Sequence, residues 1–193
     1  MLSLLGEAGL DPARVESRGF DHGTWVPLSL MYPAADIPVV QVSLPSRLGP
    51  ALQTRVGHAL ASLREQGVLL IGSGSITHNL GELDWRAGPE TITSWAREFR
   101  DWVVDRLAAN DDAALHDYRR QAPHAVRSHP SDEHLLPLYV ALGATGKTAT
   151  AERFHAGIDD RRTRSRRATA LRAGPGQRRG RCDGADITGH RMA

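Results

Sequence analysis

The first 157 residues alternate between strand-like and helix-like patterns of apolar residues, and the order of these patterns constrains the fold more than any other feature of the sequence. Residues 38–44 carry three valines and end before Pro45, which is typical of a short strand. Residues 52–63 place leucines and a valine at helical spacing, and residues 68–71 form a fully apolar run like a strand buried on both faces. Residues 90–107 repeat large apolar side chains at i, i+4, i+7 and i+8. This order predicts an α/β domain with a single mixed or mostly parallel sheet flanked by helices.

Composition narrows the class of protein. A chain of 193 residues with 40% hydrophobic and 24% charged residues is consistent with one ordinary globular domain. No run approaches the roughly 18 apolar residues that a membrane span needs, so no membrane association is expected. Residues 1–10 contain Glu7 and no basic residue, which argues against a secretory signal, and the single cysteine, Cys182, excludes a disulfide framework. We therefore expect a cytoplasmic protein.

Charge divides the chain into two parts. Residues 159–193 contain ten arginines and four aspartates, whereas residues 1–158 contain 14 basic and 18 acidic side chains. Large apolar residues such as Leu171 and Ile187 are few in the second part, so residues 158–193 are predicted to form an Arg-rich disordered tail behind a domain of residues 1–157. Polyanion binding through this tail is an alternative function. It is the less favoured one, because unstructured basic tails bind nucleic acid weakly and without specificity.

Three of the nine histidines have neighbouring residues that favour a catalytic or metal-binding role. His22 is followed by Gly23 in a stretch that predicts a tight loop. His78 follows Gly72-Ser73-Gly74 after the predicted strand of residues 68–71, at the edge where open α/β sheets bind ligands. His134 lies shortly before Pro137, which disturbs the first turn of a helix begun at residue 131. Each of them, taken singly, is more often a hydrogen-bonded loop residue than a catalyst.

The remaining candidates are weaker. Four histidines are expected to be exposed to solvent: His58, His116, His124 and His129. Gly72-Ser73-Gly74 lacks the Gly-Lys-Thr ending of a phosphate loop, and no serine lies in a nucleophile elbow. Trp95 and Trp102 fall on an apolar helical face and are expected in the core. Histidines gathered by loops instead suit a divalent transition metal such as Fe(II) or Zn(II).

Five sequence blocks in order resemble one known family, the class III extradiol ring-cleaving dioxygenases of the DOPA 4,5-dioxygenase type. The blocks are Asp21-His22-Gly23-Thr24-Trp25-Val26-Pro27-Leu28, Met31-Tyr32-Pro33, residues 38–44, Gly72-Ser73-Gly74 with His78-Asn79-Leu80, and Glu133-His134-Leu135-Leu136-Pro137-Leu138. The resemblance covers residues 1–157. It implies a non-haem Fe(II) or Zn(II) site that binds O2 and a catechol such as DOPA as its partners, and it leaves the oligomeric state open.

The resemblance also implies roles for the three histidines. By position His134 would be a metal ligand, and His78 would be either a second ligand or the acid/base residue. His22 would lie at the substrate face as a hydrogen-bond donor or proton shuttle, a role that a pKa of about 6.5 allows near neutrality.

The chain departs from the family pattern at both ends. Family members normally begin with a strand and loops that supply two further metal histidines, whereas residues 1–10 resemble an internal helix of the family. A closing apolar strand is expected after Gly157, where the Arg-rich tail follows instead. We therefore expect a fold incomplete at both ends, and a non-catalytic remnant with an incomplete metal site is the alternative to an active dioxygenase.

Overall fold

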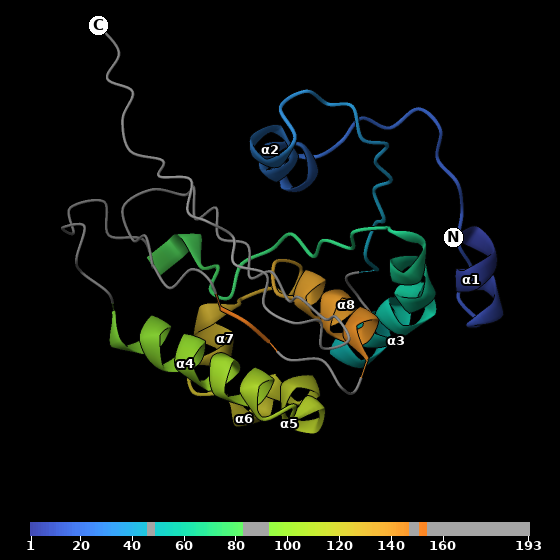
Figure 1. The fold of residues 1–193 in the computed structure, drawn as a ribbon. Helices are drawn as coiled ribbons and strands as arrows, with labels where there is room; N and C mark the ends of the chain where they lie inside the picture. The colour runs from blue at the N-terminus through green and yellow to red at the C-terminus, as the bar shows by residue number, and fades with distance from the viewer. Residues whose placement is uncertain (46–48, 83–92, 147–150, 154–193) are drawn as a thin grey trace, which may run out of the picture.

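A computed structural model describes residues 1–45, 49–82, 93–146 and 151–153, and the regular elements among these residues are helical (Figure 1). The α-helices are α1 (Leu2–Glu7), α2 (His22–Met31), α3 (Pro50–Leu60), α4 (Ser94–Ala108), α5 (Asp112–His116), α6 (Tyr118–Gln121), α7 (Ala125–Ser128) and α8 (Leu136–Thr145). Two short 3-10 helices, η1 (Ala61–Gln66) and η2 (Leu80–Glu82), complete the set. The predicted tail of residues 158–193 lies outside the described residues.

Helices α3 and α8 cross with their backbones in contact. A Cβ atom added to Gly57 of α3 would lie 2.8 Å from the backbone nitrogen of Ala144, and one added to Gly143 of α8 would lie 2.8 Å from the carbonyl carbon of Thr54. Val56 and Leu60 are buried on the same side of α3, as the helical spacing of residues 52–63 predicts. The crossing fixes α8, the helix that directly follows His134, against the body of the protein.

Helix α4 covers the larger apolar cluster. It begins at Ser94 and buries Trp95, Phe99, Val103 and Leu107, so the predicted helix is confirmed over its described part. Trp102 is half-buried and packs against the same cluster, which confirms the expectation that both tryptophans belong to the core. The cluster continues through side chains of α5, α6 and α8, namely Leu115, Tyr118, Leu135, Leu136 and Tyr139. The segment that carries His134 is anchored on this cluster by Leu135 and Leu136.

The predicted sheet is not seen in the described part of the chain. Residues 38–44 and 68–71 run without helix and without a strand ladder, and about half of their apolar side chains are exposed to solvent, with Val40 68% and Leu69 60% exposed. A strand exists only when its backbone groups pair with a neighbour, and the described residues supply no such neighbour here. The helices of the predicted α/β domain are confirmed, whereas its sheet stays a prediction.

The predicted loop around His22 is wrong, because the chain forms helix α2 there. Asp21 acts as the N-cap, since its carboxylate accepts a hydrogen bond of 3.0 Å from the backbone N–H of Thr24. The side chain of Gln41 accepts hydrogen bonds from the Asp21 N–H at 3.0 Å and the Thr24 hydroxyl at 2.8 Å. Helix α2 stands apart from the other helices in Figure 1, and Trp25 on it is half exposed.

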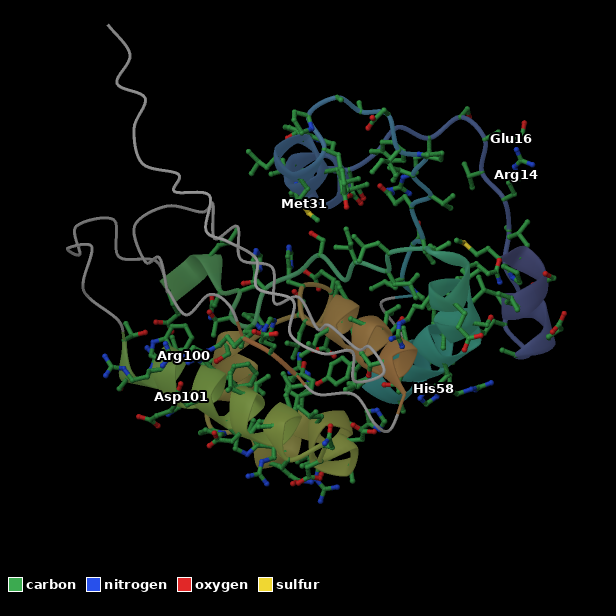
Figure 2. The ribbon with its side chains drawn as sticks, in the orientation of Figure 1. Arg14, Glu16, Met31, His58, Arg100 and Asp101 are labelled. Carbon is green, nitrogen blue, oxygen red and sulfur yellow. The ribbon has the colours of Figure 1, made fainter. Side chains whose placement is uncertain are left out.

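The side chains drawn in Figure 2 place the exposed charges at the periphery. Arg14 pairs with Glu16 at 3.4 Å on the extended stretch that leads to α2, and Arg100 pairs with Asp101 on α4. Within the described residues, no helix is both long enough and apolar enough to cross a bilayer.

Replacing Gly57 with alanine is expected to lower the free energy of unfolding by about 2–3 kcal/mol, because the new methyl group would overlap the backbone of α8. Gly143→Ala should have a similar effect from the other side of the crossing. Urea titration followed by circular dichroism measures both changes.

Gly6→Ala is the matched control for these substitutions. Gly6 also lies in a helix, α1, but nothing lies within 4 Å of its added Cβ, so alanine should be neutral or stabilise the helix by up to about 1 kcal/mol. If Gly57→Ala were as well tolerated as Gly6→Ala, the helices would not cross in backbone contact.

Candidate active site

Two segments distant in the sequence are pinned side by side. The backbone N–H of Ser75 donates to the carbonyl of His134, and the N–H of His78 donates to the carbonyl of Ser128, both at 2.8 Å. Cβ atoms added to Gly72 and Gly74 would collide with the carbonyl groups of Pro137 and His134. The two glycines therefore serve close backbone approach, which agrees with the absence of a phosphate-loop ending.

This pinning brings His78 and His134 into ring contact. Their ring centroids are 3.4 Å apart and their planes deviate by 11°, so the two imidazoles are stacked. Both side chains are half-buried. Burial, followed by the neighbouring His134, lowers the pKa of His78 against an opposing effect of Glu133, so the His78 ring is neutral at neutral pH. The structure thus unites two of the three histidines that the sequence singles out.

A third histidine lies behind the pair, and the sequence argument missed it. His129 is 0% exposed, and its Nε2 lies 2.6 Å from the carbonyl oxygen of Ile76, to which it donates. Its other ring nitrogen, Nδ1, is buried and has no hydrogen-bond partner among the described residues. Burial lowers the pKa of His129 to about 4. The predicted exposure of His129 is wrong; the helical spacing of Ala122, Ala125 and His129, all of them buried, was the signal that could have revealed it.

The loop between His129 and His134 is closed by an ionic network. Arg119 donates from Nε to the carboxylate of Asp132 at 2.8 Å and from Nη2 to the carbonyl of His129 at 3.0 Å. The hydroxyl of Tyr118 donates to the same Asp132 oxygen at 2.7 Å. Burial raises the pKa of Asp132, but the hydrogen bonds from Arg119 and Tyr118 outweigh it and hold the pKa below its usual range.

His22 reaches the same region from α2. It is the first residue of that helix and is exposed, and a Cβ added to the next residue, Gly23, would lie 3.6 Å from the hydroxyl of Ser73. The start of α2 is therefore adjacent to the glycine segment that leads to His78. The described contacts place the backbone of this histidine near the site, and its role there stays a prediction.

Three further histidines lie in the part of the chain that the structure describes, away from the stacked pair. His58 is exposed on α3 (Figure 2), and His124 is exposed with its Nε2 3.0 Å from Glu98, so both predictions are confirmed. His116 is half-buried instead of exposed, because its Nε2 lies 2.8 Å from the hydroxyl of Thr54 on α3.

A shallow pocket opens beside the stacked pair. Its wall is formed by the glycine segment, by His134 and by apolar side chains that include Ile76, Leu138 and Ala141. The hollow offers about 20 Å³, room for about one water molecule, so the described residues supply an apolar wall beside an imidazole but not the space of a whole aromatic ring.

Among the described residues, one of the two stacked imidazoles could serve as a metal ligand, but these residues do not form a complete metal centre. No group of three or more His, Cys, Asp or Glu side chains converges in the part of the chain that the structure describes. An imidazole nitrogen binds a metal in the plane of its ring at about 2.0–2.1 Å. Since the His78 and His134 planes are nearly parallel and 3.4 Å apart, one ion cannot lie in both planes.

The chain that carries this histidine pair matches a known class of enzyme domain. Residues 1–162 match the family described as the catalytic LigB subunit of aromatic ring-opening dioxygenase. The chain belongs to this family, which is the class that its sequence blocks resemble.

Individual relatives agree with this assignment. The chain is 42% identical over 154 residues to the 4,5-DOPA dioxygenase extradiol of Beta vulgaris, covering 79% of this chain and 56% of the relative. It is 39% identical over 131 residues to the protein of the same name from Escherichia coli K12, covering 67% and 48%. The chain spans about half the length of these curated relatives.

A solved structure supports the fold. The crystal structure of an uncharacterized protein from Escherichia coli K12 superposes with a TM-score of 0.72 at 33% identity, covering 82% of this chain and 65% of that one. The class III extradiol dioxygenase-like fold is thus shared between the two proteins.

The buried His129 is expected to make the protein less stable in acid. Its pKa of about 4 lies below the ordinary value of 6.5, so between these values the unfolded chain binds the proton more readily. The free energy of unfolding should therefore fall by about 3 kcal/mol as the pH drops from 6.5 to 4. Urea titrations across this pH range measure the change.

His129→Gln is the control, because glutamine can still donate to the Ile76 carbonyl but does not titrate. The variant should lack this share of the acid sensitivity, although carboxylates such as Asp132 still contribute at the lowest pH. Equal pH dependence of the two proteins would contradict a buried, neutral His129.

Proposed function

We propose that the protein is an extradiol dioxygenase that opens the ring of a catechol such as DOPA with a non-haem metal, Fe(II) or Zn(II), and O2. The observation that carries the proposal is the stacked pair of His78 and His134 beside an apolar pocket, in a chain of the ring-opening dioxygenase family. Relatives at about 40% identity are named for the DOPA reaction, and this supports DOPA as the first substrate to test.

The parallel stack favours different roles for the two histidines. His134 would be a metal ligand, and His78 would be the acid/base residue, because both rings cannot bind one ion from their stacked positions. Ligation by both would require the His78 ring to turn out of the stack. The metal, when bound, would hold the catechol oxygens and O2 next to each other.

The remaining steps belong to residues of this chain. His78 is neutral at neutral pH, because burial and His134 lower its pKa, so it can accept a proton from a catechol hydroxyl and return it later. The ring of the substrate would lie against the apolar wall that Ile76 and Leu138 form next to His134. His22, exposed at the start of α2, would donate a hydrogen bond or carry a proton at the substrate face.

The same proposal extends to the surroundings of the site. Residues 38–44 and 68–71 would pair in the single mixed or mostly parallel sheet expected of this fold, which would cover their exposed valines and leucines. The domain would comprise residues 1–157, followed by the Arg-rich tail, and the protein would act in the cytoplasm.

A second candidate function is a non-catalytic member of the family. It is favoured by one observation, that the described residues bring no three metal-binding side chains together. The two candidates differ in metal content: stoichiometric iron or zinc in the purified chain supports the enzyme, and its absence after reconstitution supports the non-catalytic protein.

His78→Gln tests the acid/base assignment. Removing the proton acceptor should lower kcat for L-DOPA about 100-fold or more, with little change in KM, because proton transfer typically contributes 10²–10⁴-fold. Dioxygen uptake of the Fe(II)-loaded protein under air, together with the yellow ring-opened product, gives both constants.

His58→Gln is the matched control, because His58 is exposed on α3 and lies outside the site, so its kinetics should equal those of the unchanged protein. A His78→Gln protein with normal kcat would refute the role of His78. A lack of dioxygen uptake by the unchanged protein with any catechol would refute the proposed activity itself.

A further inference from the structure

We infer that Arg119 is a positioning residue that sets the ring positions of His129 and His134 by clamping both ends of the loop between them. The effect of Arg119 on kcat rests on the proposed function, whereas its effect on the two histidine rings does not. The geometry on which the inference stands is independent of any substrate.

The clamp consists of one guanidinium with two partners on the same loop. Arg119 binds the backbone carbonyl of His129, where the loop begins, and the carboxylate of Asp132, near its end. The planar guanidinium presents several N–H donors in a fixed fork, so a single side chain can hold both acceptors at a set separation. The network around it is partly shielded, with the Arg119 side chain 35% exposed and that of Asp132 24% exposed.

Each end of the clamp leads to a histidine of the site. At the first end, the His129 ring donates to the carbonyl of Ile76, in the segment whose next residues carry His78. At the second end, the Asp132 carbonyl accepts the N–H groups of Leu135 and Leu136 at 2.8 and 3.1 Å, which begins α8 directly after His134. A shift of the loop would therefore move both histidines and disturb the stack with His78.

No second side chain in the described network duplicates this bridge. Tyr118 donates to Asp132 but makes no hydrogen bond to the His129 carbonyl in the described structure, so it holds one end of the loop only. The adjacent Arg120 has the same charge and lies on the same short helix. Its side chain is 85% exposed, and its ion pair with Asp117 is long, at 4.0 Å. Arg120 thus offers a matched control for charge and for local helix content.

The test compares Arg119→Ala with Arg120→Ala in the full chain. The first readout needs no activity: histidine labelled with ¹³C at Cε1 gives one ring signal per residue in a two-dimensional NMR spectrum. Arg119→Ala should shift or broaden the signals of His129 and His134, while that of His58, exposed on α3, stays in place. Arg120→Ala should leave all three signals unchanged.

The second readout is kinetic. Arg119→Ala should lower kcat for L-DOPA about 10- to 100-fold, the usual effect of losing a group that orients site residues, with KM changed much less because Arg119 has no place in the substrate pocket. Added ethylguanidinium should restore part of the kcat by filling the vacated position. A residue that stabilised the fold in general would show neither the kcat-specific loss nor this rescue.

The outcomes separate the clamp from the proposed activity. Unchanged His129 and His134 signals in a folded Arg119→Ala protein would overturn the clamp, whatever the kinetics. Shifted signals in a chain that consumes no dioxygen would support the clamp and reject the dioxygenase function. If Arg119→Ala fails to fold, Arg119→Lys and Asp132→Asn keep most of the packing, and the same signals must move in both for the clamp to stand.

Discussion

The site depends on one constraint, the close antiparallel approach of the segment before His78 to residues 128–137. Two backbone hydrogen bonds of 2.8 Å set this approach, and it is possible only because positions 72 and 74 have no side chain. Any larger residue at either position would meet a carbonyl group of the other segment. The glycines thus act on the chemistry indirectly, since they decide how near the two imidazoles come.

Helix packing transmits this constraint to the rest of the domain. Helix α8 starts directly after His134 and is held by the glycine crossing with α3 on one side and by the apolar cluster under α4 on the other. Well-packed interiors deform little, so the start of α8 has a defined position. The Asp132 network then orders the loop that precedes it, where the backbone is no longer helical.

The sequence predicted the elements in which a residue's own pattern decides the structure. Helical spacing identified α3 and α4, and the settings of His78 and His134 identified two residues that do meet. The sequence prediction failed where contact with a residue distant in the sequence decides the structure. His129 has a polar local sequence, but it is buried because Phe99 and Ile76 lie over it. Asp21 caps a helix that begins at His22, where the neighbouring glycine had suggested a loop. The valines of residues 38–44 would form a strand only if a neighbouring strand paired with them.

The stacked pair also limits how much charge the site can hold. Two protonated imidazoles 3.4 Å apart would repel each other by a few kcal/mol at the effective dielectric of a half-buried position. This repulsion helps burial to lower the pKa of His78, and His129, whose burial opposes protonation, adds no positive charge near neutral pH. An ion bound to His134 would oppose protonation of His78 further, because a cation next to an imidazole favours its neutral form. A neutral His78 is the state that can accept a proton from a bound hydroxyl group, so burial and the stacking that prevents joint ligation together keep the proposed base in its proton-accepting form.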